Sequence, residues 1–158
     1  MSDNFFDLPD LIRETFDINQ KDIREYSPLS FAFIGDCVYE LAIRTYVLAQ
    51  GNRPVKDLNK MKVKYVNAAA QTDMVDACMD IMTQEEQDIF KKGRNAKGGT
   101  VAKNQTVADY RKATGFEALC GYLYMQGKMD RVVELVKYGI EHPIDHSKKP
   151  VVFTGKDD

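Results

Sequence analysis

The sequence contains few of the residues that form disulfides or zinc sites. Its 158 residues include three cysteines, which are odd in number and widely spaced, and two histidines. This pattern excludes a disulfide framework and a Cys/His zinc site, and it favours a reducing compartment. No apolar run approaches the roughly 20 residues that cross a membrane. The acidic N-terminus also lacks the basic and apolar regions of a signal peptide, so we expect a cytoplasmic protein that does not bind membranes.

Charge of one sign is also scarce, because the net charge is only −2. A protein that coats nucleic acid without specificity carries a large positive charge, so this class is disfavoured. Basic residues nonetheless gather in two stretches, between positions 53 and 64 and between positions 91 and 103. Residues 94–104, within and just after the second stretch, contain Gly98-Gly99 and no apolar periodicity, which predicts a flexible basic loop. Such a loop is suited to phosphate contacts, although a solvated surface loop has the same composition.

Helical spacing and capping signals predict an all-α fold. Ser27-Pro28 predicts a helix start, and the helix is expected to run to about Ala49. We expect the apolar face of this helix to consist of Phe31, Ile34, Val38, Leu41, Thr45 and Leu48. Further helices are predicted near residues 9–16, 55–82 (one helix, or two with a bend), 83–93, 106–127 and 129–140. The chain divides into an N-terminal lead-in, one helical domain and a poorly ordered C-terminal tail, at residues 1–26, 27–141 and 142–158.

Two acidic residues interrupt apolar helical runs. Asp36 lies within residues 31–41 and Glu117 lies within residues 115–123. A lone carboxylate is costly to bury unless a partner or a cation compensates its charge. The pattern by itself leaves two explanations open, which are pairing with Arg or Lys and joint binding of a divalent metal. Magnesium fits the second, because it prefers oxygen ligands and retains several waters, so that one or two carboxylates suffice.

Several stretches resemble the ribonuclease III family. Residues 33–38, Phe-Ile-Gly-Asp-Cys-Val, resemble the signature helix of the family's catalytic domain. Residues 115–121, Gly-Phe-Glu-Ala-Leu-Cys-Gly, resemble its second acidic motif. Residues 92–104 and 110–124 are similar to Mini-ribonuclease III, the bacterial branch that lacks a double-stranded RNA-binding domain. The resemblance covers roughly residues 27–137.

The resemblance implies a ribonuclease III-type endonuclease fold and a C2 homodimer. It implies magnesium-dependent cleavage of double-stranded RNA, with Mn²⁺ as a substitute cation, and the family matures the ends of 23S ribosomal RNA precursor. Asp36 and Glu117 would be the catalytic residues and metal ligands. The residues expected to contact RNA are Arg94, Asn95, Lys97, Lys103 and Asn104. Whether a ribosomal protein presents the substrate is left open.

The sequence departs from full-length ribonuclease III at two acidic positions. Full-length enzymes carry an acid four residues before the signature aspartate and an aspartate three residues before the second acid, where this chain has Ala32 and Thr114. The Mini branch shares this reduction, which predicts weaker metal binding. The alternative function is a non-catalytic helical dimer that binds structured RNA, with the two acids serving as structural ion-pair partners.

Overall fold

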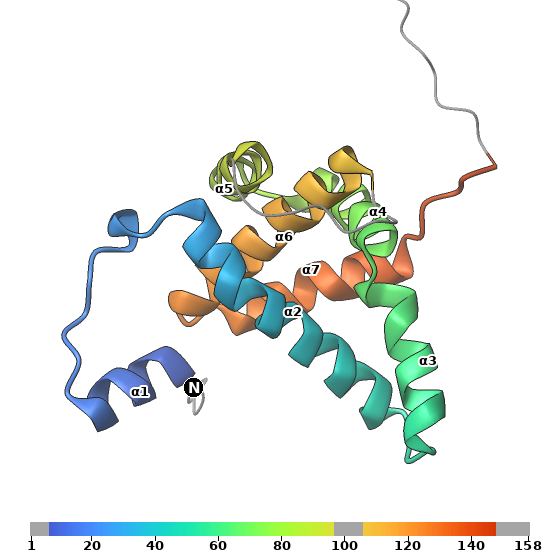
Figure 1. The fold of residues 1–158 in the computed structure, drawn as a ribbon, viewed down its shortest axis with the longest axis horizontal. Helices are drawn as coiled ribbons and strands as arrows, with labels where there is room; N and C mark the ends of the chain where they lie inside the picture. The colour runs from blue at the N-terminus through green and yellow to red at the C-terminus, as the bar shows by residue number, and fades with distance from the viewer. Residues whose placement is uncertain (1–6, 97–105, 148–158) are drawn as a thin grey trace, which may run out of the picture.

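The computed structural model describes residues 7–96 and 106–147, and these residues form only helices and connections (Figure 1). The all-α prediction is confirmed. The elements are α1 (Leu8–Phe16), η1 (Ile23–Glu25), α2 (Pro28–Ala49), α3 (Val55–Val66), α4 (Ala68–Cys78), η2 (Met79–Ile81), α5 (Gln84–Asn95), α6 (Val107–Met125) and α7 (Met129–Glu141).

Helices α2 and α6 form the centre of the molecule and cross in close contact. A Cβ atom at Gly35 would lie 1.6 Å from the carbonyl oxygen of Glu117, and one at Gly121 would lie 2.0 Å from that of Phe31. Only glycine permits this approach of two backbones. Tyr39 and Phe116 pack edge to face beside the crossing, with ring centroids 5.4 Å apart. The crossing therefore sets which side of α2 is buried.

The predicted start of α2 is confirmed, but its predicted apolar face is partly wrong. The Ser27 hydroxyl accepts a hydrogen bond from the backbone N–H of Ser30 at 3.2 Å. Leu41 and Leu48 are 61% and 55% exposed, and Phe33 is 82% exposed. The helix is apolar around most of its circumference, so the contact with α6 chose the buried side. The exposed apolar residues lie on the opposite side of α2.

The stretch from Val55 to Met82 is two helices, which was one of the two predicted arrangements. Asn67 has an extended backbone, with φ −70° and ψ 159°, and its side chain caps α4 by accepting from Ala70 N at 2.8 Å. Asparagine is favoured at such caps because its side chain competes for backbone hydrogen bonds. The break lets α3 leave the body while α4 packs against α6 and α7.

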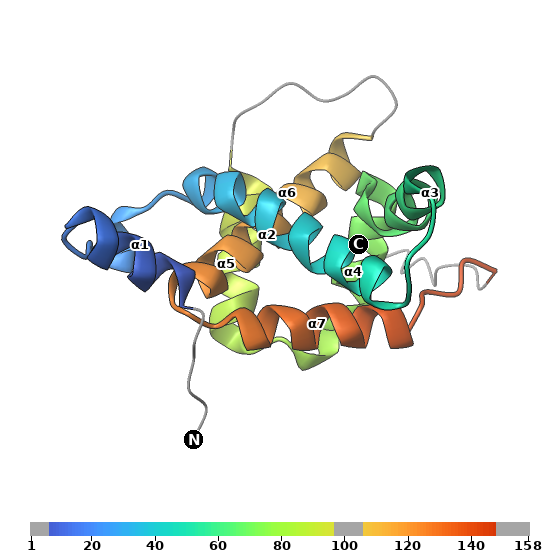
Figure 2. The same ribbon diagram turned by 90° about the horizontal axis from the view of Figure 1, so that it is seen from below.

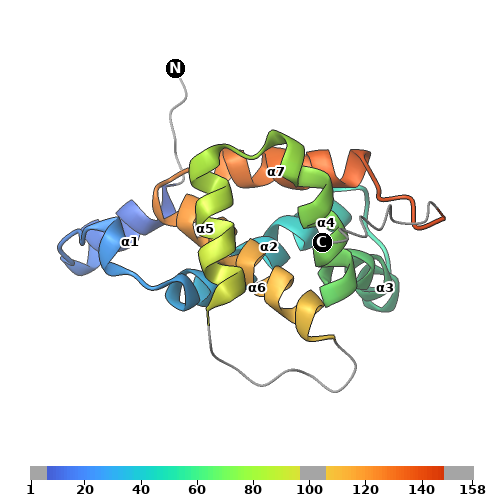
Figure 3. The ribbon, with the colours of Figure 1, turned by 90° about the horizontal axis from the view of Figure 1, so that it is seen from above.

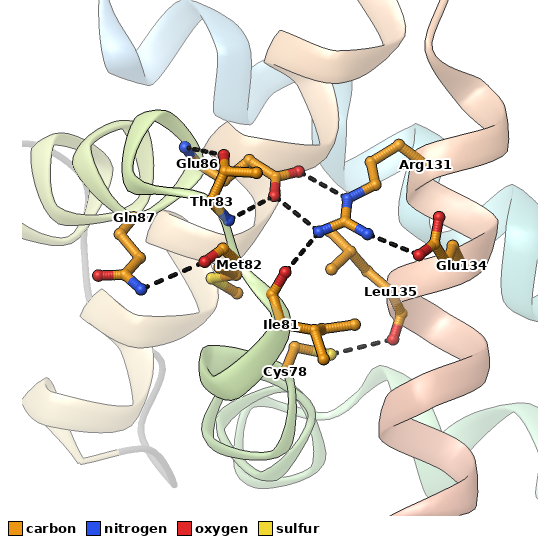
Figure 4. A network of polar contacts seen from close by, with 9 residues as sticks. All are labelled: Cys78, Ile81, Met82, Thr83, Glu86, Gln87, Arg131, Glu134 and Leu135. Atoms are coloured by element: carbon orange, nitrogen blue, oxygen red, sulfur yellow. Dashed lines mark hydrogen bonds and ion pairs between the residues drawn. The ribbon is translucent and has the colours of Figure 1, made fainter.

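A buried polar network joins α5 to α7 (Figure 4). The predicted capping box is present, since Thr83 and Glu86 exchange bonds between side chain and backbone at 2.9 and 3.1 Å. Glu86 also accepts from Arg131 at 2.8 and 2.9 Å, although it is only 5% exposed. Arg131 donates in addition to the carbonyl of Ile81 at 2.6 Å. One guanidinium thus connects α7, η2 and the start of α5.

Helices α1 and α3 lie at opposite ends of the molecule, and α7 runs along one edge (Figures 2 and 3). The short helix predicted near residues 9–16 is confirmed as α1. Its apolar residues remain largely exposed, with Phe16 at 69%. The predicted division at residues 26 and 142 remains a prediction. Of the described helices, none has the length and hydropathy needed to cross a membrane.

Candidate active site

The crossing of α2 and α6 brings Asp36 and Glu117 to one cavity. The cavity has a volume of about 480 Å³ and is walled by α2, α4, α6 and the end of α3. Asp36 is exposed at this surface, whereas Glu117 is partly buried. Gly35 contacts the backbone of Glu117, so Asp36, the next residue of α2, is held close to Glu117 of α6. The structure thus brings the two acids together, as the sequence predicted.

Asp36 and Glu117 are both costly to ionise in this cavity. Burial first, and the negative charge of Asp36 second, raise the pKa of Glu117 to about 7. Partial burial and then the charge of Glu40 raise the pKa of Asp36 above its ordinary value. For both groups burial is the largest cause, so the ionised carboxylates are poorly solvated, and the described helices offer them no basic partner to offset this cost. A cation placed between the two groups would offset it.

Pairing with Arg or Lys, which was the competing explanation, does not occur within residues 7–96 and 106–147. Glu40, one turn after Asp36 on α2, instead pairs with Arg44 at 3.0 Å and with Lys62 of α3 at 3.1 Å. These bonds lower the pKa of Glu40, and Lys62 is the larger contributor. Glu40 therefore keeps two bases occupied one turn from Asp36.

The donor set fits a hard cation that keeps most of its own water. Within the described ranges, no group of three or more His, Cys, Asp and Glu side chains could enclose a metal. Two carboxylates on an open cavity are the typical protein contribution to a magnesium site. Ala32 and Thr114, which occupy the positions of the two missing acids, also line the cavity. Their small side chains leave room for water at those positions.

The predicted RNA-binding residues are only partly described. Arg94 and Asn95 belong to the last turn of α5, so the prediction that they lie in a loop is wrong. Arg94 lies 5.7 Å above the ring of Phe90, and its Nε donates to Asn95 at 3.2 Å. Neither lines the cavity, as far as the described chain extends. Lys97, Lys103 and Asn104 lie outside the described residues, and their role stays a prediction.

One residue of the site was missed from the sequence. Gln71 of α4 lines the cavity, and its Nε2 donates to Oε1 of Glu117 at 3.4 Å. It is only 3% exposed. In the sequence Gln71 follows three alanines in an unremarkable helix, so nothing local distinguishes it. Its importance depends on the packing of α4 against α6.

The helical fold and the paired carboxylates define a ribonuclease III domain, and residues 29–128 match the Ribonuclease III domain family. The chain is 45% identical over 124 residues to Mini-ribonuclease 3 of Thermoanaerobacter sp. (strain X514), covering 78% of this chain and 87% of that relative. Accordingly, the chain belongs to the Mini-ribonuclease 3 family of endoribonucleases.

Further comparisons agree with this assignment. Mini-ribonuclease 3 of Brevibacillus brevis is 43% identical over 111 residues, which cover 70% of this chain and 83% of the relative. A crystal structure of a Fusobacterium nucleatum protein superposes with a TM-score of 0.69 at 34% identity, covering 77% of this chain and 98% of that one. The ribonuclease III fold predicted from the motifs is thereby confirmed.

Proposed function

We propose that this endoribonuclease cleaves double-stranded RNA with magnesium held by Asp36 and Glu117. The observation that carries the proposal is the pair of acids on one open cavity, without a base paired to either among the described residues. Two unneutralised carboxylates favour a divalent cation over a structural role. A purely RNA-binding protein would gain nothing from such a site, because like charge repels the phosphates.

Asp36 and Glu117 would have different roles at the site. Asp36, at the exposed side of the cavity, faces the solvent from which both water and RNA arrive. Glu117, deeper in the wall, would complete the anionic pair. When bound, magnesium supplies Lewis-acid chemistry, which activates water and offsets the charge of a phosphate. Manganese, with similar oxygen ligands, is expected to replace it.

The RNA contacts would lie outside the cavity. Arg94 and Asn95 end α5 directly before residues 97–105, which carry the other proposed contacts, Lys97, Lys103 and Asn104. Basic side chains in such a segment bind phosphates and 2′-hydroxyls, which is how RNA duplexes are recognised. Membership of the Mini-ribonuclease 3 family favours 23S ribosomal RNA precursor as the substrate.

A homodimer is also part of the proposal. Phe33, Leu41 and Leu48 form an exposed apolar stripe on α2, and Phe33 lines the cavity as well. Monomeric proteins seldom expose large contiguous apolar patches. A second copy covering this stripe would relate two cavities by a two-fold axis, which suits the two strands of an RNA duplex.

Asp36→Asn tests the proposed function. The variant keeps the shape of the side chain but loses the charge, so we expect cleavage of long double-stranded RNA in magnesium to be abolished. RNA binding, measured by filter retention, should stay close to that of the wild type because the phosphate contacts lie elsewhere. Asp80→Asn is the matched control, since Asp80 is an exposed aspartate in η2. Full cleavage by Asp36→Asn would refute the proposal.

A further inference from the structure

Gln71 is a buried polar side chain whose presence needs an explanation. Only two polar or charged side chains are buried in the described part of the chain, and these are Gln71 and Glu86. Glu86 is explained by its ion pair with Arg131. Gln71 makes one side-chain bond, from its Nε2 to Oε1 of Glu117. An amide is costly to bury unless it makes a hydrogen bond, so this bond is what favours glutamine here over an apolar residue.

The chemistry of the bond is suited to a carboxylate that must remain available to a cation. An Arg or Lys at this position would neutralise Glu117 and compete with a metal for it. A neutral amide donor can fix one carboxylate oxygen without removing the negative charge. Because Ala32 and Thr114 stand at the positions of the absent acids, no further carboxylate lines the cavity among the described residues. The orientation of Glu117 then depends on its amide neighbour.

The position of Gln71 is set by contacts that do not involve the cavity. The Asn67 cap fixes the first turn of α4, where Gln71 lies. One residue further on, the hydroxyl of Thr72 donates to Asp109 Oδ1 at 3.3 Å. Both Gln71 and Thr72 therefore connect α4 to α6, but only Gln71 reaches a carboxylate of the cavity. The chain thus offers a neighbouring residue for comparison.

We propose that Gln71 is a positioning residue, which holds the Glu117 carboxylate beside Asp36 so that the two can bind a divalent cation together. The inference rests on the proposed function, since it assigns Gln71 to the same metal site. Groups that hydrogen-bond metal ligands orient them, and their loss commonly weakens metal binding.

Gln71→Met removes the amide while keeping an unbranched side chain of similar length. We expect Mn²⁺ to bind about 10- to 100-fold more weakly, measured by electron paramagnetic resonance of the free ion. Cleavage should recover in excess Mg²⁺, whereas the KM for RNA should change little. Thr72→Val, which removes the neighbouring bond between α4 and α6, should bind Mn²⁺ like the wild type. Gln71→Leu serves as the second apolar variant if Gln71→Met does not fold.

The outcomes separate this inference from the function on which it rests. A folded Gln71→Met or Gln71→Leu with Mn²⁺ affinity equal to the wild type would overturn the positioning role alone. Equal weakening by Thr72→Val would also overturn it, because general packing of α4 would then explain the effect. Failure of the wild type to bind Mn²⁺ or to cleave RNA would instead refute the proposed function.

Discussion

At the scale of single residues, the site is governed by charge that the protein leaves uncompensated. Asp36 and Glu117 face one cavity, while the nearby bases Arg44 and Lys62 are bound to Glu40. Glu40 thus has a consequence for the site, because its negative charge helps to raise the pKa of Asp36 while Glu40 itself is paired with two bases. The arrangement destabilises the cation-free protein slightly and favours binding of a cation.

The raised pKa of Glu117 predicts a pH dependence of stability. Its value rises from 4.5 to about 7 on folding, so the native state binds more protons than the unfolded state between these pH values. The free energy of unfolding therefore falls as pH rises through this window. Glu117→Gln has no carboxyl group to ionise, so it does not lose this stability. Its free energy of unfolding, relative to that of the wild type, should increase by about 2 kcal/mol between pH 5 and pH 8.

Urea unfolding without divalent cations at the two pH values measures this difference. Comparing the variant with the wild type cancels other titrations, such as that of His146, whose pKa is raised chiefly by its hydrogen bond to Asp73. Added Mg²⁺ should remove most of the loss in the wild type. Parallel pH profiles of the free energy of unfolding for the two proteins would show that ionisation of Glu117 does not destabilise the native state.

At the scale of secondary structure, the α2–α6 crossing is the feature on which the site depends. Gly35→Ala would place a Cβ within 1.6 Å of the Glu117 carbonyl oxygen, so the helices must separate. Because the contact is with backbone, no side chain can move aside. We expect destabilisation of about 3 kcal/mol or more, together with loss of cleavage.

Gly51→Ala is the matched control for the crossing. Gly51 has φ +138° but open space around its Cβ position, so its substitution strains only the local backbone. It should lower stability by roughly 1 kcal/mol and leave cleavage intact. Thermal unfolding and the RNA assay, run on both variants, separate the two effects. Similar losses in both would mean that the crossing tolerates separation.

Three helix starts were predictable because their caps are local. Ser27, Thr83 and Thr106 each bond a backbone N–H three residues ahead, and each begins a helix where predicted. The buried face of α2 was not predictable, since apolar residues surround that helix. The apolar pattern predicts a buried Leu41, but the contact of α2 with α6 at Gly35 places Leu41 on the exposed side.

At the scale of the whole molecule, the Arg131–Glu86 pair connects elements that are distant in the chain. Burial raises the pKa of Glu86, but the hydrogen bonds and charge of Arg131, together with the hydrogen bonds from Thr83, outweigh it and the net pKa is lowered. Arg131→Met would leave this buried carboxylate uncompensated, and we expect a loss of about 3–5 kcal/mol in the free energy of unfolding. The double variant with Glu86→Leu should recover part of it.

Lys137→Met is the control, because Lys137 and Glu141 form an exposed pair at 3.8 Å. Such a pair contributes about 0.5 kcal/mol or less. Urea denaturation of the three variants measures the contrast. A small effect of Arg131→Met, comparable with that of Lys137→Met, would show that Glu86 finds other compensation.

The exposed stripe on α2 predicts the oligomeric state. Phe33→Asp would place a charge in the proposed apolar interface, and we expect the dissociation constant of the dimer to rise at least about 100-fold. Phe16→Asp is the matched control on α1, where Phe16 is 69% exposed. Light scattering after size-exclusion chromatography gives the mass of each. A wild type that is monomeric at micromolar concentration would refute the dimer.

The sequence by itself determined the all-α class, the caps, the two acids and the family, because these depend on short motifs and local hydrogen bonds. The tertiary structure decided between the two explanations of Asp36 and Glu117 by placing them on one cavity without a base among the described residues, and it alone decided that Lys62 pairs with Glu40 and that Gln71 contacts Glu117. These facts arise from contacts between helices far apart in the chain. Such contacts depend on how closely two backbones can approach, and at this site Gly35 and Gly121 made that approach possible.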